Sequence, residues 1–209
     1  MSLFEVKPYD REVYEKELKD FLPQKILDVH THVYLKEFFP PKPLAPGEVK
    51  RTVTWPSLVA ADDSIEDLQE TYRLMLPGKD VTALMFSNSG RSQQANDYVA
   101  DASRRSGFPA LYFSAPEESP EDVERQIRKG GFLGIKGYLS LSPKYIPEAE
   151  IRIFDFFPKA QLKKMDEMGA IVMLHIPRNG RLKDPVNLAQ IMEIKQEFPN
   201  IRLIIAHIG

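Results

Sequence analysis

The sequence contains no cysteine and no long apolar run. Without cysteine, this chain of 209 residues can form no disulfide bond, has no thiol nucleophile and can bind a metal ion only through nitrogen and oxygen atoms. Residues 1–10 lack the basic and then apolar pattern of a secretory signal, and no apolar stretch approaches the length that crosses a membrane. We therefore expect a cytoplasmic protein with no membrane partner.

The sequence also lacks an excess of basic residues. It has 28 lysines and arginines against 30 aspartates and glutamates, a formal net charge of -2, which argues against nucleic acid as a partner. The hydrophobic fraction of 43% is ordinary for a globular protein, and the length suffices for one sizeable core. We predict a single domain over residues 1–209 that acts on a small-molecule substrate, and homo-oligomer formation is left open.

Apolar, strand-like stretches alternate with helix-like stretches along the chain. This alternation implies right-handed βαβ units and a parallel sheet, either closed as a barrel or open and doubly wound. No G-x-G-x-x-G turn follows the first strand, which weakens the dinucleotide-binding version of the open sheet. We predict an α/β fold of the (β/α)8 TIM-barrel type with about six of the eight units present. The expected strands cover residues 26–32, 81–86, 110–114, 133–139, 170–174 and 201–206.

Polar residues and apolar spacing predict the helix starts and their buried faces. A lead-in helix is expected to start at Asp10 and to use Tyr14, Leu18, Phe21 and Leu22 on one face. The inner side of the last helix is expected to include Leu188. Further helix N-caps are predicted at Ser64, Ser119 and Asp184.

Residues 38–57 contain five prolines and the only tryptophan, Trp55. This proline content forbids regular structure and stiffens the segment. We expect a long ordered loop that lies over the functional site. An irregular surface excursion with Trp55 as a packing anchor is the alternative.

All four histidines follow apolar strands. His30 and His32 end the first strand, and His175 and His207 end the fifth and sixth strands. Because side chains alternate along a strand, His30 and His32 should lie side by side on one face. The same alternation predicts that further residues share the inward face with these histidines, namely Asp28, Ile171, Met173, Leu203 and Ile205.

The four imidazoles are expected to share one metal site. A parallel barrel brings the carboxyl ends of its strands to one mouth, where residues distant in sequence converge. A single histidine at a strand end is more often a satisfied core residue, but four together favour shared metal ligands. Lys136 lies in the run LGIKGY, where an unpaired buried amine is costly, so it is either the partner of a carboxylate or a site residue at the mouth.

The motif Asp28-x-His30-x-His32, the GIK around Lys136, His175 and the AHIG around His207 together resemble the amidohydrolase superfamily. They are most similar to the amidohydrolase-2 group of metal-dependent hydrolases and aromatic-acid decarboxylases. The resemblance implies that His30, His32 and His175 bind a divalent metal, with Zn²⁺ expected and Mn²⁺ as the alternative. It also implies catalytic roles for His207, which would contact the metal or activate its water, and for Lys136, whose counterpart in binuclear members is carboxylated and bridges two metals.

The sequence departs from this superfamily in its extent. The superfamily completes its site with an aspartate after an eighth strand, whereas this sequence stops after the sixth, so we expect a fragment of a longer chain. The leading function is hydrolysis of an amide, ester or lactone of a small, carboxylate-bearing substrate. The alternatives are non-oxidative decarboxylation of an aromatic or unsaturated acid and an inactive, truncated barrel that only binds metal or a partner. The candidate substrate-binding residues, all in loops at the same mouth, are Arg51, Arg91, Arg178 and Arg181.

Overall fold

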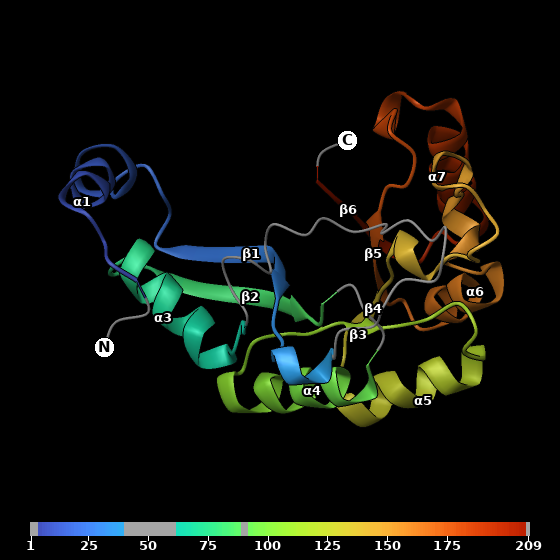
Figure 1. Cartoon of the computed structure of the whole chain (residues 1–209), viewed down its shortest axis with the longest axis horizontal. Helices are drawn as coiled ribbons and strands as arrows, with labels where there is room; N and C mark the ends of the chain where they lie inside the picture. The colour runs from blue at the N-terminus through green and yellow to red at the C-terminus, as the bar shows by residue number, and fades with distance from the viewer. Residues whose placement is uncertain (1–3, 40–61, 89–91, 208–209) are drawn as a thin grey trace.

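The computed structural model describes residues 4–39, 62–88 and 92–207, and within these ranges strands alternate with helices (Figure 1). All hydrogen-bonded strand pairs among them are parallel, so the predicted α/β fold with a parallel sheet of six strands is confirmed. The strands are β1 (Lys25–His32), β2 (Asp80–Phe86), β3 (Tyr112–Phe113), β4 (Gly134–Lys136), β5 (Ile171–His175) and β6 (Arg202–Ala206). The helices that follow them are α3 (Ile65–Met75), α4 (Gln93–Ser106), α5 (Pro120–Gly130), α6 (Lys159–Glu167) and α7 (Pro185–Glu197).

The sheet consists of two pieces that meet at a narrow seam. Strand β1 pairs with β2, while β3, β4, β5 and β6 pair in that order. A single bridge between Met85 and Ala110 joins the pieces. Beyond it, the Asn96 side chain on α4 donates to the carbonyl of Phe113 (3.1 Å) and accepts from its N–H (2.9 Å). A helix side chain therefore takes the role of a neighbouring strand at this point.

Each face of the sheet carries its own apolar cluster. The larger cluster joins strand residues such as Met85 and Val172 to residues of the helices, such as Val99 and Leu162. These helices lie along the lower and right-hand sides of Figure 1. The smaller cluster, here called the inner cluster, consists of strand residues on the opposite face of the sheet. Its buried members are Leu84, Phe86, Leu111, Met173 and Ala206, with Ile171 and Ile204 packed against them.

The predicted N-caps at Ser64, Ser119 and Asp184 are confirmed. The side chains of Ser64 and Ser119 accept hydrogen bonds from the backbone N–H three residues later, and Asp184 accepts from Val186 and Asn187. These bonds satisfy N–H groups that a helix leaves free in its first turn.

The expected lead-in helix is present, but its predicted start is wrong, and of its predicted buried face Tyr14 is buried whereas Leu18 and Phe21 are exposed. Helix α1 (Pro8–Val13) starts after Lys7 and passes at once into a π-helix, Tyr14–Leu18. The wider π turn changes which side chains share a face. Tyr14 is buried and donates to the carbonyl of Pro77 (2.6 Å), whereas Phe21 is 81% exposed.

The expected inner side of α7 is also wrong at Leu188, which is 48% exposed. Its neighbour Asn187 is fully buried because its amide donates to the carbonyls of Pro177 (3.1 Å) and Arg181 (3.0 Å). These two bonds turn Asn187 inward, and Leu188 therefore lies at the edge of the buried face.

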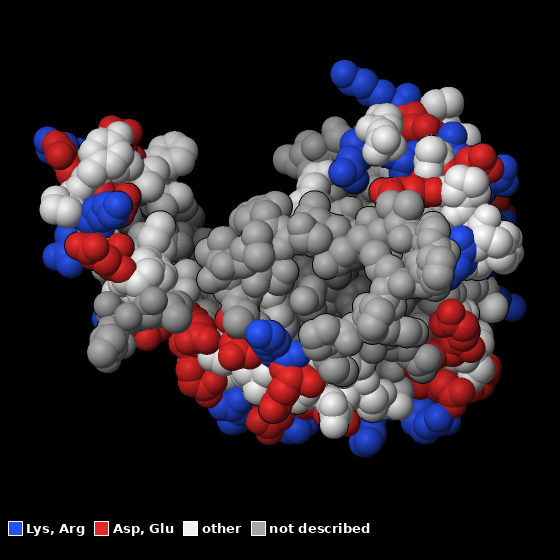
Figure 2. Space-filling model, viewed as in Figure 1, with Lys and Arg blue, Asp and Glu red and all other residues white. Residues whose placement is uncertain are grey.

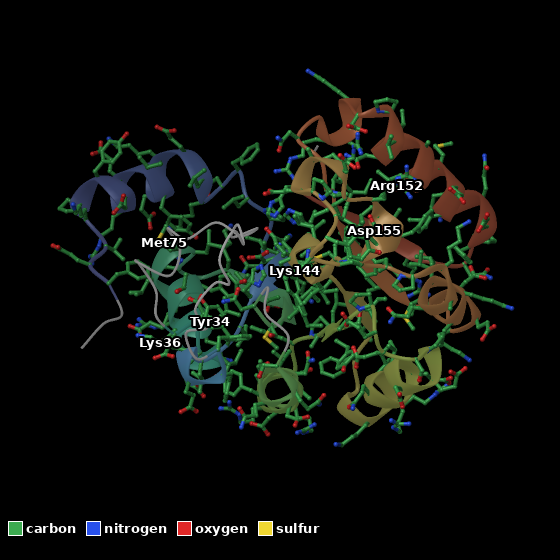
Figure 3. All side chains as sticks on the ribbon, turned by 45° about the vertical axis from the view of Figure 1, so that its right-hand side comes forward. Tyr34, Lys36, Met75, Lys144, Arg152 and Asp155 are labelled. Carbon is green, nitrogen blue, oxygen red and sulfur yellow. The ribbon has the colours of Figure 1, made fainter. Side chains whose placement is uncertain are left out.

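Most of the proline-rich segment predicted to cover the site, residues 38–57, lies outside the described residues. The chain on either side of it is held together by Tyr34 and Asp63, whose backbone N–H groups each donate to the other's carbonyl (2.8 and 2.9 Å). Tyr34 and Lys36 are labelled in Figure 3, and Lys36 donates its N–H to Asp62 (2.7 Å). The two sides of this segment therefore lie next to each other at the end of β1.

The described surface carries both signs of charge. Basic and acidic side chains are interspersed along the lower rim in Figure 2, in keeping with the small net charge. Among the described residues, no helix is both long and apolar enough to span a membrane.

The close approach of β4 and β5 gives a testable prediction. A Cβ atom on Gly134 would lie 1.9 Å from the carbonyl oxygen of Ile171, so Gly134→Ala should force the two strands apart. We expect a loss of about 1–3 kcal/mol in the free energy of unfolding, measured by urea denaturation. The control is Leu133→Ala, because Leu133 is 49% exposed and should lose less than about 1 kcal/mol. Equal losses in the two variants would contradict the steric argument.

Candidate metal centre

The four histidine rings lie in a row of consecutive contacts. The ring centroids are 5.4 Å apart for His32 and His30, 4.5 Å for His30 and His207, and 5.2 Å for His207 and His175. Residues that are up to 177 positions apart in the sequence, 207 minus 30, are thus brought together at the carboxyl ends of β1, β5 and β6. The structure therefore groups the four histidines as expected.

A bulge in β1 directs His30 and His32 to the inner face. Between the pairs Asp28–Ala83 and Thr31–Met85, β1 has two residues where β2 has only one. Such an extra residue reverses the alternation of side chains beyond it. His32 consequently pairs with Phe86 of the inner cluster, while Asp28 pairs with Ala83 of the larger cluster. The prediction that Asp28 points the same way as the two histidines is wrong.

His207 also departs from simple strand alternation. Ile204 and Ala206 face the inner cluster, whereas Leu203 and Ile205 pack against the larger, helix-covered cluster. The prediction that Leu203 and Ile205 face inward is therefore wrong. His207 lies one residue beyond β6 and has a left-handed backbone (φ 52°), and this turn brings its ring into contact with His30 and His175. On β5 the predicted pattern holds, since Ile171 and Met173 both belong to the inner face.

Phe86, the last residue of β2, lies at the centre of the site. Its ring contacts His30 (5.1 Å) and His32 (4.6 Å) edge to face, and the Nζ of Lys136 lies 5.4 Å from its centroid. Tyr138 lies against His175, with ring centroids 4.4 Å apart. Sequence reasoning did not select either aromatic residue for the site, although both occur at strand ends, the same position that identified the histidines.

The hydrogen bond of His32 determines which of its nitrogens is free. Its Nδ1 lies 2.8 Å from the carbonyl oxygen of Ser87, which can only accept, so Nδ1 carries the proton. The lone pair is then on Nε2, and a carbonyl partner of this kind is typical of metal-binding histidines.

Burial keeps the imidazoles neutral. It is the largest cause that lowers the pKa of His30 to about 3, of His32 to about 4 and of His175 to about 2. The positive charge of Lys136 acts in the same direction on all three. At neutral pH each ring therefore offers a lone pair, as metal binding requires.

Lys136 is buried beside the Phe86 ring. It is 1% exposed, and among the described residues its Nζ finds no hydrogen-bond acceptor. Burial lowers the pKa of Lys136 to about 7. Of the two predictions for this residue, the carboxylate partner finds no support in the described part of the chain, and the position beside the histidines favours a site role.

The donor set fits a divalent cation in its chemistry, because neutral imidazoles are common metal ligands. Among the three proposed ligands, His30 and His32 have ring centroids 5.4 Å apart, whereas His175 joins the row through its contact with His207. Within residues 4–39, 62–88 and 92–207, however, no three histidine, aspartate or glutamate side chains form a group that could hold a metal ion. The shared metal site of His30, His32 and His175 therefore stays a prediction.

The candidate arginines differ in their surroundings. Arg178 donates from Nε to Asp184, the N-cap of α7, at 2.9 Å. Arg181 donates to the carbonyl of Ile176 (2.9 Å), and its charge is one of the causes, after burial and Lys136, that lower the pKa of His207. Both arginines have left-handed backbones, with φ of 47° and 50°. Arg51 and Arg91 lie outside the described residues.

A comparison with protein families supports the sequence resemblance. Residues 27–209 match the family model described as Amidohydrolase. A search of curated proteins found no match. Similar solved structures include an uncharacterised TIM-barrel protein of Bordetella bronchiseptica and a dihydroorotase of Campylobacter jejuni.

These two structural similarities are remote. For the Bordetella bronchiseptica protein the identity is 11% and the TM-score is 0.48, and the alignment covers 86% of this chain and 65% of that one. For the dihydroorotase the identity is 18% and the TM-score is 0.38, with 61% of this chain and 39% of that chain covered. The chain thus spans less than two thirds of the length of either protein.

The burial of Lys136 gives a prediction about stability and pH. The pKa of Lys136 is lower in the folded state than its ordinary 10.5, so the unfolded chain binds more protons between pH 7 and pH 10.5. The wild-type protein should therefore gain stability as the pH rises through this interval. Lys136→Met removes the buried amine and should raise the free energy of unfolding at pH 7 by about 1–3 kcal/mol.

This advantage of Lys136→Met should shrink as the pH rises toward 10, measured by urea denaturation at several pH values. The control is Lys163→Met, at an exposed position on α6, which should show no such dependence. A constant difference between wild type and Lys136→Met across this pH range would contradict the prediction.

Proposed function

Because this chain belongs to the amidohydrolase family, we propose that it is a metal-dependent hydrolase in which His30, His32 and His175 hold one divalent cation. The observation that carries the proposal is the row of neutral, contacting imidazoles at the strand ends. We expect Zn²⁺, with Mn²⁺ as the alternative, because nitrogen donors suit both ions and the sequence has no cysteine. When bound, such a cation supplies Lewis acidity toward a carbonyl group and toward water.

His207 and Lys136 are the proposed catalytic residues. His207 is exposed and its ring lies between those of His30 and His175, so it can exchange a proton with substrate and with solvent. Lys136 is buried beside Phe86, and burial lowers its pKa to about 7, so both the neutral and the protonated amine are present near neutral pH. The neutral amine can accept a proton, and the protonated amine can stabilise developing negative charge.

Arg181 is the proposed partner of a substrate carboxylate. Its guanidinium donates a hydrogen bond to the carbonyl of Ile176, one residue after His175. Its positive charge contributes to the lowered pKa of His175 and of His207. A planar guanidinium binds a carboxylate through two parallel hydrogen bonds. Arg178 is less suited to this role because its Nε is already bound to Asp184. The proposed substrate is therefore a small carboxylate-bearing amide, ester or lactone.

One prediction of this proposal distinguishes the effect of losing a metal ligand from the effect of losing the proton-transfer residue. His175→Ala should weaken Zn²⁺ binding at least 100-fold and abolish turnover, because it removes a ligand from the open site. His207→Ala should keep Zn²⁺ affinity within about tenfold and lower turnover by about 10²–10⁴. Bound zinc is measured by elemental analysis and calorimetry, and turnover with a panel of carboxylate-bearing amides, esters and lactones.

The same panel tests the other functions. Wild-type protein that binds no stoichiometric metal would refute the proposed centre. Release of CO₂ from aromatic or unsaturated acids without hydrolysis would identify a decarboxylase. Tight metal binding without turnover of any substrate would favour a binding role.

Another prediction of this proposal concerns substrate binding. Arg181→Gln should raise KM for carboxylate-bearing substrates about 10–100-fold while kcat changes less, because the ionic contact holds ground state and transition state alike. The control is Arg178→Gln, which should leave KM within about threefold and instead weaken the start of α7. Steady-state kinetics with a substrate and its uncharged amide analogue measure the effect. An equal rise of KM for both substrates would contradict the assignment.

A further inference from the structure

A tyrosine on α3 links the two sides of the β1 bulge. The Tyr72 hydroxyl donates to Oδ2 of Asp28 (2.9 Å) and lies 3.3 Å from Oγ1 of Thr31. The other oxygen of Asp28, Oδ1, accepts the backbone N–H of His30 (3.0 Å). One side chain from outside the sheet thus reaches the residues before and after the extra residue of β1.

The direction of each hydrogen bond follows from the groups involved. Burial raises the pKa of Tyr72 well above its ordinary value, so the phenol keeps its proton. That proton goes to the Asp28 carboxylate, so the Tyr72 oxygen accepts from the hydroxyl of Thr31. Thr31 therefore donates to Tyr72, and Tyr72 donates to Asp28. The other carboxylate oxygen of Asp28 accepts the backbone N–H of His30.

This arrangement bears on His30 because of the bulge. A bulge leaves the extra residue without its regular strand partner, and the Asp28 carboxylate satisfies the N–H of His30 instead. If the bulge moved by one residue, the side chain of His30 would turn to the opposite face of the sheet, away from His207. The hydrogen bonds to Asp28 and Thr31 fix both sides of the bulge and so oppose this movement.

We propose that Tyr72 is a positioning residue that sets the orientation of His30 through Asp28 and Thr31. The inference rests on the proposed metal centre and extends it to a helix that supplies none of its ligands. Tyr72 acts through the backbone and side chains of β1, because its hydroxyl bonds Asp28 and Thr31 rather than the imidazoles.

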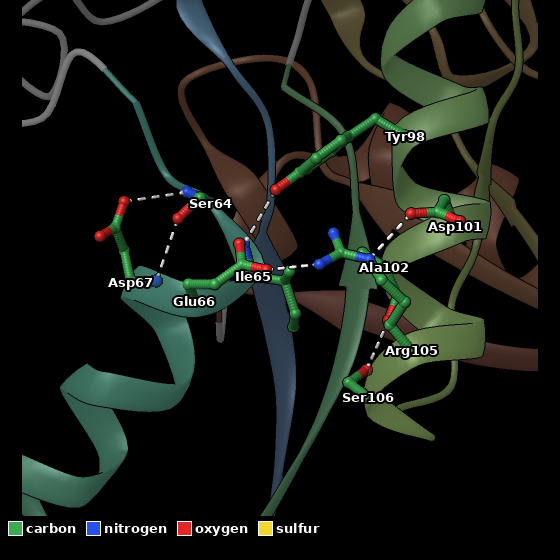
Figure 4. A network of polar contacts seen from close by, with 9 residues as sticks. All are labelled: Ser64, Ile65, Glu66, Asp67, Tyr98, Asp101, Ala102, Arg105 and Ser106. Carbon is green, nitrogen blue, oxygen red and sulfur yellow. Dashed lines mark hydrogen bonds and ion pairs between the residues drawn. The ribbon is translucent and has the colours of Figure 1, made fainter.

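Tyr72→Phe tests the proposal, with Tyr98→Phe as a matched control. The Tyr98 hydroxyl accepts the N–H of Ile65 (3.1 Å) at the start of the same helix, so its loss affects α3 without touching β1 (Figure 4). Tyr72→Phe should weaken Zn²⁺ binding about 10–100-fold in calorimetry, the usual effect of losing an outer hydrogen bond at a metal site. Tyr98→Phe should change it less than about threefold.

A second measurement follows His30 in the metal-free protein. The ring Cε1–H resonance of His30 should move in the NMR spectrum of Tyr72→Phe but not in that of Tyr98→Phe. Asp28→Asn, which keeps the size of the side chain, should move the same resonance and serves if Tyr72→Phe does not fold. Equal Zn²⁺ affinity and an unmoved His30 resonance would overturn the inference, as would equal effects of the two tyrosine variants. Wild-type protein that binds no Zn²⁺ would refute the proposed function, whereas the His30 resonance would still decide the role of Tyr72.

Discussion

The exclusion of water around Phe86 is the constraint on which the site depends. Its ring lies against His30 and His32 and near the amine of Lys136, and burial is the largest cause that lowers the pKa of all three groups. Keeping polar nitrogen atoms away from water is costly in a fold that offers them few partners. This cost, concentrated at the strand ends, is typical of a binding site rather than of a region selected for stability alone.

The fold and the membership of the site could be predicted from the sequence because they follow from repeated, local signals. Alternating apolar strands and capped helices predicted the parallel sheet, and the helix caps at Ser64 and Asp184 are present. The histidines were identified because each ends an apolar strand, and parallel strands bring such ends together. These three signals, namely apolar strands, helix caps and strand ends, can be recognised without knowledge of tertiary contacts.

The orientation of the site residues could not be predicted in the same way, because single residues override the regular alternation. The bulge in β1 turns Asp28 toward α3, and the left-handed φ of His207 turns its ring back over the sheet. The residues that contact these features lie far away in the sequence, such as Tyr72 at Asp28 and His175 at His207, and no local pattern encodes such contacts. Phe86 was overlooked for a related reason, since an apolar residue at the end of a buried strand carries no distinct chemical signal.

The seam between the two pieces of the sheet divides the site. His30 and His32 belong to the two-stranded piece, whereas Lys136, His175 and His207 belong to the other piece or directly follow it. The bridge at Met85 and Ala110 joins the described strands across the seam, and the amide of Asn96 on α4 bonds Phe113 just beyond it. A cation held by imidazoles from both pieces would act as a cross-link between them. Metal binding would then stabilise the association of the two pieces, and separation of the pieces would release the metal.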